Sequence, residues 1–278
     1  MTLRATLRAL GAFSIGAAGS LTAATLLKSH PPGGIQRWAR TNYAGHPVTL
    51  LEGPAFVLSA VSGALAGGAG APAAVAGLGA GAFGALDDLA GEGSSKGLRG
   101  HLAAARHGEV TTGAIKIVGL GATGLLTSWI IDRPQTRTRP VATLVGGAVI
   151  AGSANIVNLL DLRPGRALKV VLLLSAPLVA FGRGIPGSNA AAGAAAGAAI
   201  GSLPDDLAGR SMLGDTGANS AGALLGTALV ARTGLSGRLL ALALVTALTL
   251  ASEKLSFTTV IESTPGLREL DALGRSSG

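Results

Sequence analysis

Residues 140–161 read PVATLVGGAVIAGSANIVNLLD, an apolar run that carries no charge until it ends on an aspartate. The run is long enough to cross a bilayer as a helix, which takes about 20 residues. A carboxylate at a membrane boundary is costly unless it is solvated, paired or bound to a cation. The stretch therefore predicts a membrane-spanning helix that brings a polar group to the membrane surface.

Two further acidic clusters lie at the edges of apolar stretches. Asp87-Asp88 closes one stretch, and Asp215 opens another. If the three clusters face one another across a helix bundle, they can hold a divalent metal for phosphate chemistry. Each cluster alone is explained equally well by a helix cap or a solvated loop charge. Their common position on one predicted membrane face favours a shared site.

The composition is that of a membrane protein. Of the 278 residues, 48% are hydrophobic and only 13% are charged, against about 25% charged in soluble domains. The 44 glycines suit close packing of membrane helices. The net charge of +8 lies in loops, where anionic headgroups or phosphates explain it better than nucleic acid does. With no cysteine, disulfides and thiolate chemistry are excluded.

The chain predicts a single all-α domain over residues 1–278, a polytopic membrane bundle of about nine helices. The first segment imitates a signal peptide, but we interpret it as the first span because the chain stays apolar to about residue 251. In the seventh span, Gly193, Gly197 and Gly201 recur every four residues, which favours a close-packed helix over a linker. The predicted spans are 9–27, 48–67, 70–86, 110–131, 140–159, 167–183, 187–203, 216–232 and 238–252.

The distribution of positive charge predicts the orientation. With the acidic loops in the cytoplasm, fourteen of the 22 basic residues are cytoplasmic, as the positive-inside rule favours. This places the active site on the cytoplasmic face of the inner (plasma) membrane, with residues 252–278 as a cytoplasmic tail. An interfacial helix is predicted over Leu98–His107.

The acidic clusters suggest phosphoryl transfer. Mg²⁺ keeps several waters and needs few protein ligands, so Asp87, Asp88 and Asp215 suit it. Asn155, Asn158 and Asp161 are spaced three apart and share a helix face, where they can contact metal or substrate.

Basic residues accompany the acids and can bind phosphate oxygens, although each is also explained as a topogenic charge. Lys116 differs because it lies about a turn inside an apolar run, where an idle ammonium is disfavoured. His101 and His107 lack a third ligand for zinc, and the chain has no Walker loop and no nucleophile elbow. The candidate phosphate-binding residues are Lys96, Lys116, Arg163, Arg166 and Arg210.

At these residues the chain resembles the polyprenyl-phosphate glycosylphosphotransferases, which include phospho-N-acetylmuramoyl-pentapeptide transferase. The family has an Asp-Asp pair after an apolar span, matched by Asp87-Asp88. Its Asn-x-x-Asn-x-x-Asp motif is matched at 155–161, and its Gly-Asp-x-Gly motif is matched at 214–217. The order of the motifs agrees from about residue 45 to residue 230.

The resemblance implies a Mg²⁺-dependent enzyme, with Mn²⁺ as a substitute. It would move a sugar-1-phosphate from a UDP-sugar to a polyprenyl phosphate and release UMP, in cell-envelope polymer synthesis. It implies catalytic roles for Asp87, Asp88 and Asp215, with Asp88 and Asp215 as metal ligands. It also implies that Lys116 contacts substrate, as the asparagines, Asp161 and Asn219 would. A homodimer is left open.

The chain departs from the family pattern in three places. Pro164 stands where the family has a second aspartate, and Arg163 and Arg166 beside it could replace part of the sugar-nucleotide contact. Ala218 replaces the serine of Gly-Asp-x-Gly-Ser. The tail from residue 253 has no histidine, whereas better-known members have a histidine-rich loop there.

Two alternatives remain. A catalytically inactive scaffold of envelope assembly is compatible with the departures at Pro164 and in the tail. A secondary transporter is compatible with glycine-rich spans, although no internal repeat is found and the acids lie at one surface. The Asp-Gly-x-x-Ala-Arg pattern of the CDP-alcohol phosphotransferases is not present.

Overall fold

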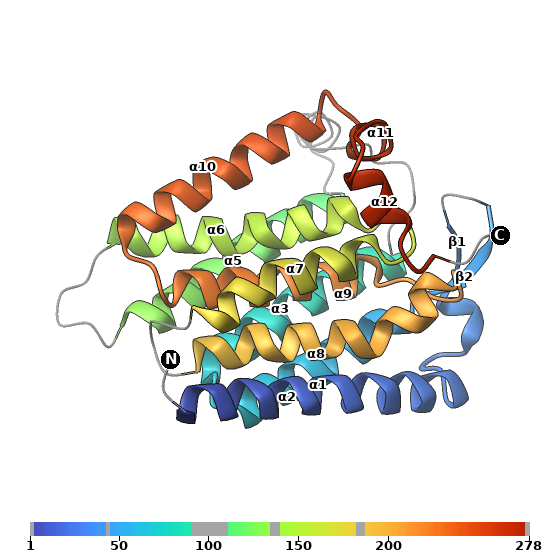
Figure 1. Ribbon diagram of the computed structural model, residues 1–278, viewed down its shortest axis with the longest axis horizontal. Helices are drawn as coiled ribbons and strands as arrows, with labels where there is room; N and C mark the ends of the chain where they lie inside the picture. Colours follow the sequence, from blue (N-terminus) through green and yellow to red (C-terminus); the bar gives the residue numbers. More distant parts are fainter. Residues whose placement is uncertain (1–2, 43–44, 91–110, 134–139, 182–186, 276–278) are drawn as a thin grey trace.

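The computed structural model is a bundle of long helices, and it describes all residues except 1–2, 43–44, 91–110, 134–139, 182–186 and 276–278 (Figure 1). Each of the nine predicted apolar stretches coincides with a helix of the described chain. These helices are α1 (Leu3–Ser29), α2 (Glu52–Ala66), α3 (Gly70–Ala90), α5 (Thr112–Asp132), α6 (Pro140–Leu160), α7 (Arg166–Ala180), α8 (Ser188–Leu207), α9 (Gly214–Val230) and α10 (Leu235–Ser252).

Within the described residues, five helices are long and apolar enough to cross a membrane: α1, α3, α5, α6 and α10. The sequence predicts nine spans, and α2 is apolar but shorter than these five. The protein is therefore an all-α bundle with the composition of a membrane protein. The predicted helix over Leu98–His107 lies outside the described residues.

Close helix packing through glycine organises the first layer. Gly193, Gly197 and Gly201 lie on the face of α8 that contacts α1, as their spacing predicted. A Cβ at Gly197 would lie 2.0 Å from the carbonyl oxygen of Phe13, so no side chain fits there. The stretch 188–202 is thus a helix, as predicted, because its glycines let two backbones touch.

Helix α9 forms the centre of the bundle. It packs against α2, α3, α6, α7 and α8, and nearly all of its residues are buried. Helix α10 lies at the edge, where it packs mainly on α6 and exposes leucines such as Leu240 and Leu244. In Figure 1 it runs obliquely across the top of the bundle. An exposed apolar helix of this kind suits contact with lipid.

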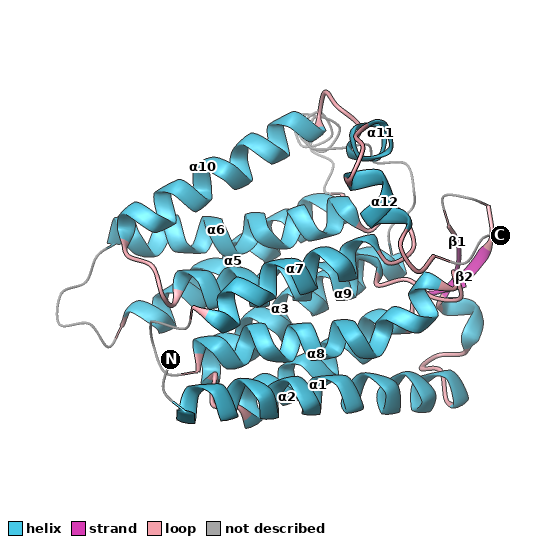
Figure 2. Ribbon diagram, in the orientation of Figure 1, coloured by secondary structure: helices cyan, strands magenta, loops and turns pink. Residues whose placement is uncertain are grey.

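Polar elements gather at one end of the bundle, where α3 and α6 end and α5, α7 and α9 begin; we name it the acidic end (Figure 1). A 3-10 turn, η1 (Ile35–Arg37), leads into β1 (Ala39–Thr41), which pairs antiparallel with β2 (Pro47–Thr49). Figure 2 shows these strands, in magenta, at the right-hand end of an otherwise helical structure. Two short helices, α11 (Phe257–Ser263) and α12 (Leu267–Ala272), also lie there. The acidic end therefore collects the predicted motifs.

Candidate active site at the acidic end

Helix α3 meets the beginning of α9 at a contact that only glycine permits. A Cβ on Gly84 would lie 2.2 Å from the carbonyl oxygen of Asp215, inside van der Waals contact. Gly84 thus allows the last turn of α3, with Asp87 and Asp88, to lie against the first turn of α9. The sequence prediction ended this span at residue 86, whereas α3 continues through both aspartates to Ala90.

Asp88 caps helix α9 from a neighbouring helix. Its Oδ1 accepts the amide N–H of Asp215 at 3.1 Å, and its Oδ2 accepts the Thr216 amide at 2.9 Å and hydroxyl at 2.6 Å. These amides at a helix N-terminus have no intrahelical acceptor, and the helix dipole favours a negative charge there. Gly214, with φ of +59°, adopts the left-handed conformation that brings the amides to Asp88.

Lys116 joins the first and third acidic clusters. Its ammonium lies 2.6 Å from Asp87 Oδ2 and also forms an ion pair with Asp215 Oδ2. All three side chains are largely but not wholly buried. Asp87 and Asp215, which lie 29 and 99 positions from Lys116 in the sequence, therefore meet at one ammonium group on the same side of the bundle. Lys116 is thus not an idle ammonium in its apolar run, and its predicted contact with substrate stays a prediction.

A cavity of about 500 Å³ opens beside this group. Asp87, Asp88 and Asp215 line one part of it, and Asn158 and Asp161 line another. The second acidic cluster therefore faces the other two across a shared space. Asn155 differs, because its amide contacts the Thr249 hydroxyl of α10 at 3.5 Å and it does not line this cavity.

The two arginines beside Pro164 are held by the C-terminal helices. The Arg166 guanidinium is buried and binds both carboxylate oxygens of Asp271 in α12, at 2.8 and 2.9 Å. Arg163 forms an ion pair with Glu262 in α11 at 2.9 Å. Arg166 was a candidate phosphate-binding residue, but in this arrangement its guanidinium is bound by a carboxylate of the chain itself.

We expect Asp271→Asn to release α12, because it removes the carboxylate partner of a buried guanidinium. Burial opposes the charge of Asp271, but hydrogen bonds from Arg166 and Arg275 outweigh it and hold its pKa below the ordinary value. The stabilisation of α12 by the Arg166–Asp271 ion pair is therefore fully present above pH 3.8, and it is lost as the pH falls through this lowered pKa. Trypsin should cut at Arg268 about tenfold faster in the variant, the effect of about 1.4 kcal/mol. Equal rates in the variant and the wild type would contradict the docking role.

Other predicted substrate contacts lie elsewhere. Arg210 is exposed and pairs with Asp205, away from the cavity. Asn219 is 0% exposed inside α9 and does not line the cavity, so the structure does not provide the implied substrate contact. Lys96 lies outside the described residues.

Sequence reasoning missed Arg40 and Asp206. Arg40 lines the cavity and donates to the backbone carbonyl of Asp88, although the sequence showed only a basic residue in a loop. Asp206 is buried near Asp161. The sequence did hold a signal for it, since Asp205-Asp206 is a second aspartate pair that ends an apolar helix, as Asp87-Asp88 does.

The residues present fit a Mg²⁺ ion. The Asp87 and Asp215 carboxyl groups meet at the Lys116 ammonium and line the cavity, so they could hold a cation that keeps most of its waters. Asp88, predicted as a ligand, already has both carboxylate oxygens engaged by α9. Among the described residues, no three His, Cys, Asp or Glu side chains form a complete metal-binding group.

No protein-family model matches the chain, and no curated protein matches it significantly. The resemblance to the glycosylphosphotransferases therefore rests on the short sequence motifs alone.

Proposed function

We propose that the protein transfers a sugar-1-phosphate from a UDP-sugar to a polyprenyl phosphate at a membrane surface, with release of UMP. The observation that carries the proposal is the meeting of Asp87, Lys116 and Asp215 at the 500 Å³ cavity. These residues come from three helices, and two of them belong to motifs of the resembling family. Chance placement of solvated charges would not gather them around one ammonium.

The main physical difficulty of this reaction is the approach of two anions, a lipid phosphate and a nucleotide diphosphate. Positive groups fixed in a partly buried cavity lower that barrier, because the low dielectric strengthens each interaction. Lys116, paired with the cavity-lining Asp87 and Asp215, supplies one positive group, and Arg40, which lines the cavity, supplies a second. A bound Mg²⁺ would neutralise the diphosphate and polarise its phosphorus. Asp87 and Asp215 would hold the metal, and they orient Lys116 in the described structure.

The position of the cavity suits a lipid substrate. It lies where several apolar helices end, so a polyprenyl chain could remain in the bilayer while its phosphate reaches Lys116. We place this end in the cytoplasm and propose nine spans, because fourteen of the 22 basic residues are then cytoplasmic. The support is the helix over each predicted span and the alternating direction of these helices.

The test is UMP release by purified protein from a panel of UDP-sugars, with Mg²⁺ and polyprenyl phosphate. We expect release from at least one donor and a fall of about a hundredfold or more in Asp215→Asn, because the charge that orients Lys116 is removed. Asp205→Asn is the matched control, since Asp205 is half-buried and pairs with Lys28 and Arg210 away from the cavity. Release from no donor, or equal rates in Asp215→Asn and the wild type, would refute the proposal.

An inactive scaffold is the second candidate, favoured by one observation. Arg163 and Arg166, which could replace the missing family aspartate as donor contacts, are engaged by Glu262 and Asp271 of the same chain. The two candidates separate in cells. Where deletion of the gene harms growth, Asp87→Ala/Asp215→Ala should reproduce the harm if the protein is an enzyme and should grow normally if it is a scaffold.

A further inference from the structure

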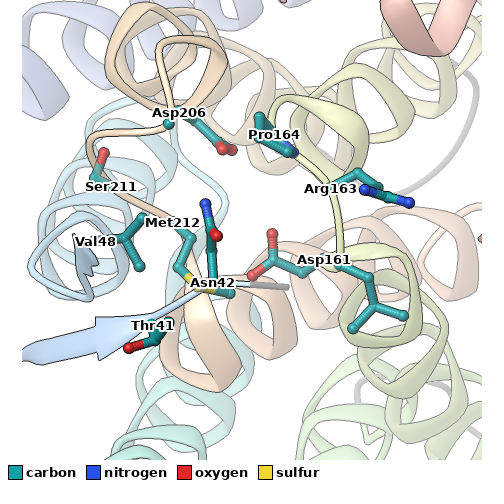
Figure 3. A pocket seen from close by; sticks show the side chains of 11 residues that line it. Thr41, Asn42, Val48, Asp161, Arg163, Pro164, Asp206, Ser211 and Met212 are labelled. Carbon is teal, nitrogen blue, oxygen red and sulfur yellow. The ribbon is translucent and has the colours of Figure 1, made fainter. Parts of the chain in front are cut away.

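A second cavity, of about 270 Å³, adjoins the first at the acidic end (Figure 3). The two cavities share Asp161 and Met212 in their walls. The second cavity reaches further toward the end of α8, where Asp206 lies, and toward Ser211 in the loop before α9. In Figure 3 the carboxylates of Asp161 and Asp206 point toward the same space.

Each of these two carboxylates is buried and has one oxygen without a hydrogen-bond partner in the described part of the chain. Asp161 is 6% exposed and Asp206 is 2% exposed. One oxygen of Asp206 accepts the Gly165 amide at 3.2 Å. Within the described part of the chain, Oδ2 of each aspartate is buried without a hydrogen-bond partner. Burying two such oxygens beside one cavity is costly. Burial, and after it the nearby charge of Asp206, raises the pKa of Asp161 well above its ordinary value.

The nearby cations are already engaged. Lys169 donates to the backbone carbonyls of Leu270 and Asp271, and Arg275 binds Asp271. Arg163 lines the second cavity but forms its ion pair with Glu262. A third acid makes the balance more negative, because Glu52 is buried behind Ser211. Lys169 still opposes the charge of Asp206, but the two buried aspartates and Glu52 outnumber it.

Ser211 adds a hydroxyl oxygen that can act only as an acceptor toward the cavity. Its hydroxyl donates its only proton to Glu52 Oε2, so the oxygen can present only lone pairs to the cavity that it lines. Two carboxylate oxygens and a hydroxyl oxygen form a hard, all-oxygen donor set, which suits Mg²⁺ or Mn²⁺. A volume of about 270 Å³ also leaves room for waters, each of which takes about 30 Å³ in the liquid.

We propose that Asp161, Asp206 and Ser211 bind a hydrated divalent cation of the Mg²⁺ type in this second cavity. The site is separate from Asp87 and Asp215, and it does not depend on the proposed transferase activity. Three protein oxygens are few for Ca²⁺, which takes six to eight oxygen ligands, whereas Mg²⁺ commonly keeps several waters. The cation would place positive charge beside the wall that both cavities share.

The test is direct Mn²⁺ binding by purified protein without substrate, measured by the electron paramagnetic resonance signal of the free ion. We expect a binding event that Asp206→Asn weakens at least tenfold. Asp205→Asn is the matched control, because the adjacent carboxylate pairs with Lys28 and Arg210 and does not line the cavity, and it should bind as the wild type does. Asp215→Asn should retain the event, which separates this site from the first.

Thermal unfolding shows whether a variant that binds less Mn²⁺ is still folded. Asp206→Asn removes one of two neighbouring buried carboxylates, so it should be at least as stable as the wild type in cation-free buffer. Added Mn²⁺ should raise the midpoint of Asp206→Asn less than the midpoints of the wild type and of Asp205→Asn, because only the cavity site is lost in that variant. Asp161→Asn provides a second variant with the same expected loss. Unchanged binding in both cavity variants, or a wild type whose Mn²⁺ binding vanishes wholly in Asp215→Asn, would overturn the proposal.

Discussion

Gly84→Ala is expected to separate α3 from α9 and to destabilise the protein by about 3 kcal/mol, the upper part of the range for overpacked cores. The added Cβ would lie 2.2 Å from the Asp215 carbonyl oxygen, 2.5 Å from its carbon and 2.7 Å from the Thr216 nitrogen. All three are backbone atoms, so no change of rotamer relieves the contact. The helices must move apart, although alanine is intrinsically the better helix former by about 1 kcal/mol.

The movement would also dismantle the candidate site. Asp88 reaches the amides of Asp215 and Thr216 only while α3 touches α9, and Lys116 spans the same junction. We therefore expect Gly84→Ala to lose the cap and the ion pair together. UMP release, if the proposed function holds, should fall below detection even at temperatures where the variant is still folded.

The measurement is unfolding by SDS in mixed micelles, followed by the fluorescence of Trp38, which is buried at the acidic end. Gly121→Ala in α5 is the matched control, because a Cβ there meets nothing within 4 Å. The control should be neutral or up to about 1 kcal/mol more stable, the opposite sign for the same substitution. Equal stability of Gly84→Ala and the wild type would show that the α3–α9 contact is looser than described.

The helices could be predicted from the sequence because their signal is local. An apolar run such as 140–159 needs only its own length and composition to indicate a helix, and α6 covers it as Pro140–Leu160. Even the alanine-rich stretch 188–202 was recognisable, since the four-residue glycine spacing anticipates the contact with α1. The number of helices that cross the membrane is less certain from composition, because the buried helices α8 and α9 do not need apolar surfaces that face lipid.

Helix ends and site contacts were less predictable because they depend on distant residues. The span expected from residue 216 begins at Gly214, since Asp88 of another helix caps it. Arg166 was a reasonable phosphate ligand by composition, yet its partner is Asp271, 105 positions away. Such a pairing has no periodic pattern to indicate it. The acids that end helices were predictable as a group, whereas their partners were not.

Arg238→Met is expected to cost about 3–5 kcal/mol, on the order of a hundredfold to several thousandfold in the folding equilibrium, because it leaves a buried carboxylate without its partner. Arg238 of α10 binds both oxygens of Asp132 of α5 at 2.7 Å. It also donates to the carbonyls of Ala142 and Val230 at 2.9 and 3.2 Å. One guanidinium thus ties α10, at the edge of the bundle, to α5, α6 and α9 at the end opposite the candidate site.

SDS unfolding also tests this prediction, with Trp129 as the reporter because it lies near Asp132 in α5. Arg232→Met is the matched control, since Arg232 donates to the neutral side chain of Asn189, and its cost should stay below about 1.5 kcal/mol. The double variant Asp132→Leu/Arg238→Met should recover most of the loss, because the cost comes from the stranded charge and not from the missing bond. If the double variant were as unstable as Arg238→Met alone, the carbonyl contacts, and not the ion pair, would hold α10 in place.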